Sequence, residues 1–317
     1  MFVRSDAPLS DMSRPSGYIF LDEENAVVAE QLRKYASLSK KEVLNTRLTD
    51  FDDCLLVMEA GRDSQVLHLN LAMPRLRDIL SAGGQEMLEE EYKPYLTDPQ
   101  EGFDVAIAAD FGALPEDVDT VISKFAGLKQ RLLAAPFRAL FRKLLSGAST
   151  PSTARVVPYR SKETAYLVPS ADRVVCVFSV YFADVTDSAL ARVILQEFAD
   201  VGRVVGEAPP CNFSVDPPRE LKDMTLREDV GAPGHVGFVS FAVLREHIAT
   251  PNKLHKVSSL LATFRAYLMY HIKATKSHLH TRMRRRVALM QQVLNRAVPE
   301  KQDGAKKLAS GRVFVRK

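Results

Sequence analysis

Three histidines and a run of basic residues lie close together near the C-terminus, in LMYHIKATKSHLHTRMRRR, residues 268–286. Histidine is a common zinc ligand, so His271, His278 and His280 are candidates for metal chemistry. The segment has a helical pattern, and on a helix positions 278 and 280 point about 200° apart, while 271 lies roughly 10 Å along the axis from 278. Because the three side chains do not converge on one point, we expect no metal site.

Other fragments look like parts of catalytic motifs. The tripeptide DFG at 110–112 is found in protein kinases, but no glycine-rich loop or His-Arg-Asp loop precedes it, so we interpret it as a strand end before a helix cap. Gly231, Gly234 and Gly237 precede a strand, whereas a dinucleotide-binding fingerprint follows one. The acidic run 89–91 is interpreted as a solvated helix face. With no nucleophile elbow or phosphate loop either, the sequence predicts no enzyme, no catalytic residue and no cofactor.

Charge is distributed unevenly along the 317 residues. Residues 1–150 carry 17 Lys and Arg against 24 Asp and Glu, and residues 151–251 carry 10 against 13. Residues 252–317 carry 16 basic residues against two acids. An acidic body with a strongly basic C-terminal fifth indicates an acidic partner for that end.

Composition bounds the remaining possibilities. Hydrophobic residues make up 46% of the chain, which is enough for a substantial core. The three cysteines, Cys54, Cys176 and Cys211, show no metal-like spacing and are expected to be reduced thiols. No run approaches the ~20 apolar residues of a membrane span. We expect a soluble cytoplasmic protein in which residues 1–17 form a flexible extension.

Periodicity predicts the same order of elements in two halves of the chain. In the first half, a short helix at 26–35 precedes three strands, a helical segment at 75–92, another strand and a long helix at 117–145. After the Gly- and Ser-rich linker 146–154, three strands, a helix at 187–202, a strand and a second long helix follow. The sequence therefore predicts an α+β fold with two similar sheet-plus-helix domains in tandem, 18–150 and 151–251, and the recurring order of elements indicates an ancient duplication.

The last predicted helix is much longer than an ordinary domain helix. No Gly or Pro occurs between Asn252 and Val298, so one helix of about 70 Å is allowed over 252–299, before a basic tail at 300–317. Apolar residues spaced by three and four form a stripe along it. A domain of about 100 residues is too small to cover the whole stripe, so part of it is predicted to face another chain. The predicted seam residues are Leu254, Val257, Leu261, Phe264, Leu268, Ile272, Leu279, Met283, Val287, Met290 and Leu294.

Several segments of the C-terminal half resemble one known family. FRAYLMYHIKATKSHLHTRMR at 264–284 and VLNRAVP at 293–299 are similar to the signature of the second subunit of the actin-related protein 2/3 complex, a seven-membered assembly that nucleates branched actin filaments. DRVVCVFSVYF, PPRELKD and GHVGFVSFAVLREH also match. The resemblance is specific over 155–299 and weaker before it, and the chain departs from the expected pattern at Ala266 and at Arg285 and Arg286.

This resemblance implies a non-catalytic role. The long helix would pair antiparallel with the corresponding helix of the fourth subunit, and the two subunits would hold the two actin-related proteins and bind the side of the mother filament in the actin cytoskeleton. The basic residues would then face acidic actin. The predicted filament contacts are Lys273, Lys276, Arg282, Arg284, Arg285 and, on the loop that opens the second domain, Arg160.

Two other classes of function remain open from the residues alone. A nucleic-acid binder would use the basic helix against phosphates, but here the basic residues share their helix with a continuous apolar stripe. A helix bound by calmodulin, or lying on an anionic membrane, would also be basic and amphipathic, although such segments are usually shorter and have more cleanly divided faces.

Overall fold

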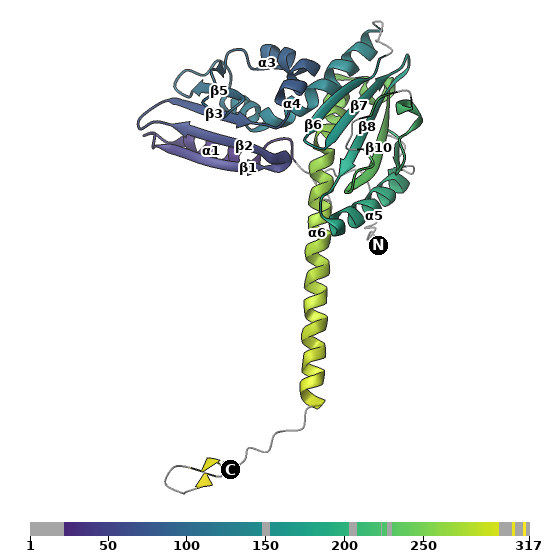
Figure 1. Cartoon of the computed structure of the whole chain (residues 1–317). Coiled ribbons are helices and arrows are strands. Elements are labelled where there is room, and N and C mark those ends of the chain that lie inside the picture. Colours follow the sequence, from purple (N-terminus) through teal and green to yellow (C-terminus); the bar gives the residue numbers. More distant parts are fainter. Residues whose placement is uncertain are drawn as a thin grey trace, which may run out of the picture. The chain divides into compact units, whose positions relative to one another are not determined.

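The computed structural model (Figure 1) describes residues 22–147, 153–202, 208–222, 224–226 and 230–297, together with 306–307 and 313–314. It has an α+β fold with two five-stranded antiparallel sheets, and this confirms the predicted fold class. The chain divides into two units, Met1–Ile272, which contains both sheets, and Lys273–Lys317.

The first sheet and its helices come from residues 26–146. The elements are α1 (Ala26–Ser37), β1 (Leu44–Asp50), β2 (Cys54–Ala60), β3 (Val66–Ala72), α2 (Leu76–Ile79), α3 (Gln85–Glu91), β4 (Leu96–Thr97), β5 (Val105–Asp110) and α4 (Val118–Ser146). Side chains at the predicted helix starts cap the helices: Asn25 accepts hydrogen bonds from the first turn of α1, and Asp117 does so for α4. Helix α4 continues through Pro136, in spite of the donor lost there.

The helical pattern predicted at 75–92 is interrupted in the structure. A π-helical turn, Leu80–Gly84, separates α2 from α3, and Gly83 adopts a φ of 121° inside it. A Cβ atom added at Gly83 would lie 3.0 Å from the Cβ atom of Ala139 in α4. Glycine therefore provides both the backbone angle and the close approach of this turn to α4.

The second sheet and its helices repeat this arrangement from residue 155 onward. The elements are β6 (Arg155–Arg160), β7 (Glu163–Pro169), β8 (Arg173–Tyr181), α5 (Val185–Gly202), β9 (Cys211–Ser214), β10 (His235–Leu244) and α6 (Pro251–Ala297). The short strands β4 and β9 were not predicted, because two and four residues are too few for a periodic pattern to emerge. Two further two-residue strands, β11 (Lys306–Lys307) and β12 (Val313–Phe314), pair with each other.

Strand order supports the interpretation of a duplication. The sheets run β1-β2-β3-β5-β4 and β6-β7-β8-β10-β9, so in each the fifth strand lies between the third and the short fourth strand. In each half a helix follows the third strand and a long helix follows the fifth. Two sheets with the same non-sequential order of strands are difficult to explain by local pattern alone.

The hydrophobic core is shared by the two halves of the first unit. Phe137 of α4 packs against Phe178 of β8, with ring centroids 5.9 Å apart, and Phe178 also contacts Phe264 of α6 at 5.5 Å. One continuous buried cluster includes residues of both sheets. Part of the predicted linker, 148–152, lies outside the described residues, as do the predicted extension 1–17 and most of the tail 300–317. The core crosses the predicted boundary between the domains.

Candidate interaction site

Helix α6 begins with a well-defined cap. Thr250 accepts a hydrogen bond through its hydroxyl from the backbone N–H of Lys253 (3.2 Å), and its carbonyl accepts the N–H of Leu254 (2.9 Å). Pro251 occupies the first helical position, where its missing N–H is not needed. The helix is 47 residues long, because no Gly or further Pro interrupts it before Ala297.

The N-terminal part of α6 is part of the core of its own chain. Six predicted seam residues are buried there: Leu254, Val257, Leu261, Phe264, Leu268 and Ile272. Phe264 lies among Phe178, Phe198 and Phe241, with ring centroids 5.1–5.9 Å away. The sequence argument assigned all six to a contact with another chain, but contacts within this chain account for their burial. The predicted seam residues that this chain leaves exposed all lie beyond Ile272.

A buried ion pair fixes this part of α6 to the second sheet. Nε of Arg265 donates to both carboxylate oxygens of Glu163, at 2.6 and 2.8 Å, and Nη2 donates to the carbonyl of Tyr181 (3.2 Å). The guanidinium also lies over the Phe182 ring, 4.2 Å from its centroid. Burial raises the pKa of the Glu163 carboxyl, while the charge of Arg265 and the N–H of Tyr181 act in the opposite direction.

Arg160, a predicted filament contact, belongs to the same network. Its guanidinium lies 3.0 Å from Oδ2 of Asp53, in the turn between β1 and β2, and 3.2 Å from Oε2 of Glu163. Its side chain is only 17% exposed. Arg160 therefore bridges hairpins of the two sheets, and these contacts provide a structural role for the residue.

Beyond Ile272, α6 presents an apolar stripe that this chain leaves exposed. We define the main stripe as Leu279, Met283, Val287, Met290 and Leu294, which are 43–66% exposed. Every side chain from Ser277 to Arg296 is exposed. The five residues span an arc of about 80° when projected at 100° per residue. Exposed apolar residues aligned in this way mark an interaction surface rather than the scattered apolar residues of an ordinary surface.

Basic residues surround the main stripe. Residues 273–297 contain seven Lys and Arg and no Asp or Glu. A helix of this composition has no i to i+4 ion pairs to offset its self-repulsion, and an acidic neighbour would stabilise it. Five predicted filament contacts lie here: Lys273, Lys276, Arg282, Arg284 and Arg285.

The histidines of this region do not form a common site. His271 is half-buried between Tyr267 and Tyr270, with ring centroids 4.2 and 5.5 Å away, whereas His278 and His280 are exposed. Burial lowers the pKa of His271. Across the described part of the chain, no group of three His, Cys, Asp or Glu side chains is arranged to hold a metal ion.

Among the described helices, none is both long enough and apolar enough to cross a membrane.

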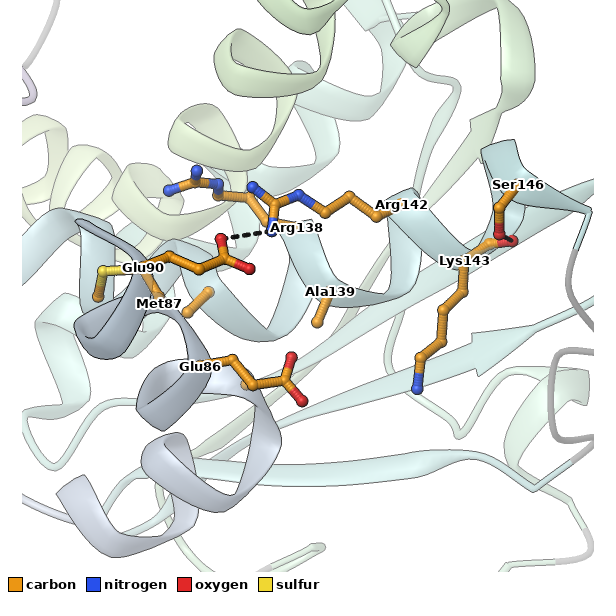
Figure 2. Close-up of a pocket in the computed structure, with 10 residues that line it drawn as sticks. Glu86, Met87, Glu90, Arg138, Ala139, Arg142, Lys143 and Ser146 are labelled. Atoms are coloured by element: carbon orange, nitrogen blue, oxygen red, sulfur yellow. Dashed lines mark hydrogen bonds and ion pairs between the residues drawn. The ribbon is translucent and has the colours of Figure 1, made fainter.

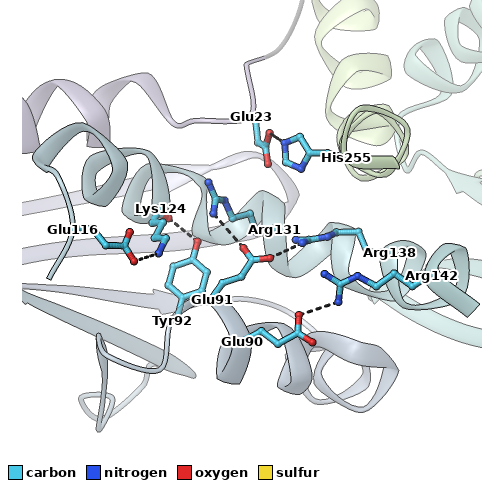
Figure 3. Close-up of polar contacts among 10 residues, drawn as sticks. All are labelled: Glu23, Glu90, Glu91, Tyr92, Glu116, Lys124, Arg131, Arg138, Arg142 and His255. Carbon is cyan, nitrogen blue, oxygen red and sulfur yellow. Dashed lines mark hydrogen bonds and ion pairs between the residues drawn. The ribbon is translucent and has the colours of Figure 1, made fainter. Parts of the chain in front are cut away.

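The acidic run 89–91 has a structural role that was not predicted. Glu91 accepts hydrogen bonds from Arg131 (3.2 Å) and Arg138 (2.5 Å), and Glu90 pairs with Arg142 (2.9 Å) (Figure 3). The three arginines lie on α4, whereas both glutamates lie on α3. The interpretation as a solvated face was therefore wrong for Glu91, whose side chain is 20% exposed. The pairing partners are 40–52 residues away in the sequence and leave no local pattern.

A hollow of about 360 Å³ lies between α3 and the C-terminal half of α4 (Figure 2). Its charged lining includes Glu86, Glu90, Arg138, Arg142 and Lys143. Two of its arginines pair with α3 carboxylates, and the Ser146 hydroxyl donates to the Lys143 carbonyl at 3.0 Å. The hollow is therefore a groove between two helices whose charged side chains pair with each other.

Comparison with known proteins identifies the family. A family model described as "Arp2/3 complex, 34 kD subunit p34-Arc" matches residues 69–301, more than half of the chain. The chain belongs to this p34-Arc family. The Actin-related protein 2/3 complex subunit 2 of Dictyostelium discoideum is 32% identical over 298 residues, which cover 93% of this chain and 99% of that protein. The protein of the same name from Schizosaccharomyces pombe is 32% identical over 318 residues, with the same coverage.

The family match reaches further than the sequence resemblance. The p34-Arc model begins at Leu69, in β3, and the two relatives align with most of the chain, so the likeness extends into the first sheet. Beyond Ile272 in this p34-Arc chain, two exposed large apolar residues of α6, Leu289 and Val293, were not predicted as site residues. The predicted stripe followed one series of apolar residues spaced by three and four, and these two residues lie beside that series. A projection of every residue around the helix axis would have found them.

Proposed function

We propose that this p34-Arc family chain is a non-catalytic scaffold subunit of an actin-related protein 2/3 complex. It would pair through the main stripe with a helix of subunit 4 and help to hold the two actin-related proteins in the cytoplasmic actin cytoskeleton. Holding two actin-like proteins together removes the entropic cost of collecting a nucleus, and contact with a mother filament would make the new filament a branch.

One observation carries this proposal more than any other. The main stripe is an exposed apolar surface on a helix segment of 25 residues that has no acid, and the family to which the chain belongs is named for a complex subunit. Burying these side chains against a partner helix would stabilise an assembly by ~1.5–3 kcal/mol for each fully covered residue. An acidic partner would also relieve the repulsion among the basic residues.

Assembly is tested by placing charges in the main stripe. We expect Met283→Asp with Met290→Asp to abolish co-purification of the other subunits, because an unpaired buried charge costs several kcal/mol. The matched control is Thr281→Asp with Ala288→Asp, which introduces the same two acids seven residues apart but projects about 160° from the main stripe. Mass spectrometry of the purified material gives the readout.

Two results would contradict the assembly proposal. One is normal stoichiometry with the Met283 and Met290 variant, which would place the seam elsewhere. The other is recovery of the unaltered chain with nucleic acid, with calmodulin in a calcium-dependent manner, or with membranes, but without actin-related proteins. That result would favour the alternative functions of a basic amphipathic helix.

Filament binding is a separate part of the proposal and rests on the five basic residues of α6 that were predicted as filament contacts. Arg160 is left out because its guanidinium is engaged by Asp53 and Glu163. We expect Lys273→Glu, Lys276→Glu and Arg284→Glu together to weaken cosedimentation of the intact complex with filaments by about tenfold, since exposed charge pairs contribute ~0.5 kcal/mol each. A control with Lys34→Glu, Lys40→Glu and Arg62→Glu makes the same change in net charge. Equal binding by both variants would argue against a filament contact on α6.

A further inference from the structure

The apolar surface of α6 is wider near its C-terminal end than one paired helix requires. Leu289 and Val293, which we call the second row, are 61% and 58% exposed. On a helical projection they extend the apolar arc from the ~80° of the main stripe to about 160°, and they do so only in the last three turns. A seam between two helices is a narrow stripe, so this extra width needs its own explanation.

The second row points away from the centre of the main stripe. Leu289 lies about 120° and Val293 about 80° from the mean direction of the main stripe. A helix laid along the main stripe would cover Met283 and Met290 and leave Leu289 on its outer side. Two large apolar side chains, spaced as i and i+4 neighbours, would then remain in water on an assembled complex.

Charge is concentrated on the same side. Arg285 and Arg286 precede Leu289 by four and three residues, Arg296 follows Val293 by three, and Arg282 lies four residues before Arg286. All four arginines project on the side of the helix that carries the second row. The opposite flank of the main stripe, over residues 287–296, carries Gln291 and no Lys or Arg.

We infer that the second row is a docking site for a second protein of the same assembly, distinct from the protein whose helix covers the main stripe. Its surface would present apolar side chains ringed by carboxylates, because the apolar pair would sit in the middle and the four arginines at the edge. This inference rests on the proposed function, since it assumes that the main stripe is already occupied by a partner helix.

The chemistry of the second row favours a protein over other occupants. A nucleic-acid backbone would pair with the arginines but would offer no apolar surface to Leu289 and Val293. Membrane association scales with buried apolar area, and two residues are a small area once the main stripe is covered. An acidic protein surface with an apolar centre satisfies both the apolar pair and the arginines.

Site-specific photo-crosslinking in the intact complex tests this inference. A benzophenone-bearing amino acid is introduced singly at 287 or 294, in the main stripe, and at 289 or 293, in the second row. The complex is purified from cells and irradiated without added filaments, and the crosslinked proteins are identified by mass spectrometry. We expect positions 287 and 294 to label one protein and positions 289 and 293 to label a different protein of the complex.

A paired substitution measures the strength of the contact. Leu289→Ser with Val293→Ser is expected to lower the retention of that second protein at least fivefold during washing at 0.3 M salt, while the main-stripe partner stays bound. The control, Ala288→Ser with Gln292→Ser, has the same i and i+4 spacing on the far face and should retain both proteins. Retention of both proteins by the Leu289 and Val293 variant would overturn the inference.

The outcomes separate this inference from the proposed function. If no complex is recovered with the unaltered chain, the proposed function fails and the inference with it. If positions 287 and 294 label a partner but 289 and 293 label that same protein or none, only the inference is overturned. Labelling from 289 and 293 that appears only with added actin filaments, or that goes to lipid or nucleic acid, also overturns it.

Discussion

The two long helices occupy corresponding places in the two halves of the molecule, yet they differ in length and burial. Helix α4 has 29 residues and is buried at intervals from Val121 to Leu144, close to its end. Helix α6 has 47 residues, but its last buried residue is Ile272, 22 residues from its start. Each long helix therefore contributes about 22–29 residues to the core of this fold, and the remaining part of α6 has no such role.

This difference shows which part of α6 extends beyond the core-building length that the two helices share. The shared part of the two helices builds a core, and the part found only in α6 carries exposed apolar residues without a single acid. An exposed apolar stripe of this length marks an interaction surface. The comparison therefore separates the residues that build the core from the exposed residues through which we propose that the chain binds its partner.

The largest expected effect comes from shortening α6 to the length that the core needs. A chain that ends at Ile272 should unfold at nearly the same denaturant concentration as the full chain, because the side chains from Ser277 to Arg296 are exposed. The same truncation should abolish recovery of the other subunits. Urea unfolding and co-purification provide the two measurements, and loss of the fold on truncation would show that the distal segment stabilises its own chain.

Matched substitutions at the ends of the two helices refine this test. Leu140 and Leu144 of α4 are buried and spaced by four residues, like the exposed Met290 and Leu294 of α6. Changing either buried leucine to Ala should cost ~2–5 kcal/mol of unfolding free energy. Met290→Ala and Leu294→Ala should each change it by less than ~0.5 kcal/mol. Similar losses at both ends would remove the distinction between the helices.

Each long helix also carries one buried cation directed at a hairpin of its own half. Lys129 of α4 lies 3.2 Å from Oδ2 of Asp50 and donates to the carbonyl of Phe51 (2.8 Å), while Arg265 of α6 binds Glu163. The acids differ in their access to water, because the Asp50 side chain is 17% exposed and that of Glu163 only 2%. Asp50 also accepts a hydrogen bond from Asn25 (3.2 Å).

Removing the two cations should therefore have unequal effects. Arg265→Ala leaves a carboxylate with almost no water access and should cost ~3–5 kcal/mol of unfolding free energy. Lys129→Ala should cost less, ~1–3 kcal/mol, because Asp50 can hydrate. Urea unfolding of the chain that ends at Ile272 gives both values. As a control, Arg265→Met with Glu163→Leu removes both charges and should recover most of the loss. Failure to recover would mean that the hydrogen bonds of the two side chains to the Tyr181 backbone contribute more than the ion pair.

Much of this architecture could be predicted from the sequence, because it is recorded locally. Apolar residues that alternate or occur in short runs predicted the eight longest strands, four in each half of the chain. The absence of Gly and Pro predicted the long helix α6.

 The caps Asn25 and Asp117 and the stop at Gly147 follow from residue types that act on their own neighbours. Local signals of this kind need no knowledge of the tertiary structure.

The remainder depends on contacts between distant residues. The apolar stripe of α6 looks uniform in the sequence, and only the position of the second sheet decides that Leu268 is buried while Leu279 is exposed. Arg265 and Glu163 are 102 residues apart, so neither carries a local sign of the other. For the same reason Arg160 was interpreted as a surface contact, although its guanidinium binds Asp53, 107 residues away.

The smallest expected effect concerns how the two halves respond to acid. Burial lowers the pKa of His235, His247 and His271, all in the second half. For His247, Lys253 acts in the same direction and Glu246 in the opposite one. In the first half, burial by itself raises the pKa of the Glu91 carboxyl, but Arg138 and Arg131 outweigh it, so its pKa lies below the ordinary value.

The pKa values of the three histidines and of Glu91 are all shifted downward, but the pH ranges in which these groups titrate differ. A group whose pKa is lower in the folded state binds fewer protons there, so its stabilising contribution is complete above the unfolded pKa and is lost as the pH falls through the folded value. For the histidines this loss begins near pH ~6.5, and for Glu91 near pH ~4.3. Mild acid should therefore loosen the second half before the first.

Hydrogen exchange at pH 7.0 and 5.5, corrected for intrinsic exchange rates, would detect this order. Protection of amides in β8 and β10 should fall at pH 5.5, while that in β2 and β3 should change little. His247 offers a matched control, because its Nδ1 accepts the backbone N–H of Leu244 (3.0 Å) and an Asn amide oxygen could accept the same hydrogen without titrating. His247→Asn should therefore reduce the pH dependence in β10. An equal loss of protection in both sheets would show that the shared core, and not the histidines, sets the response to acid.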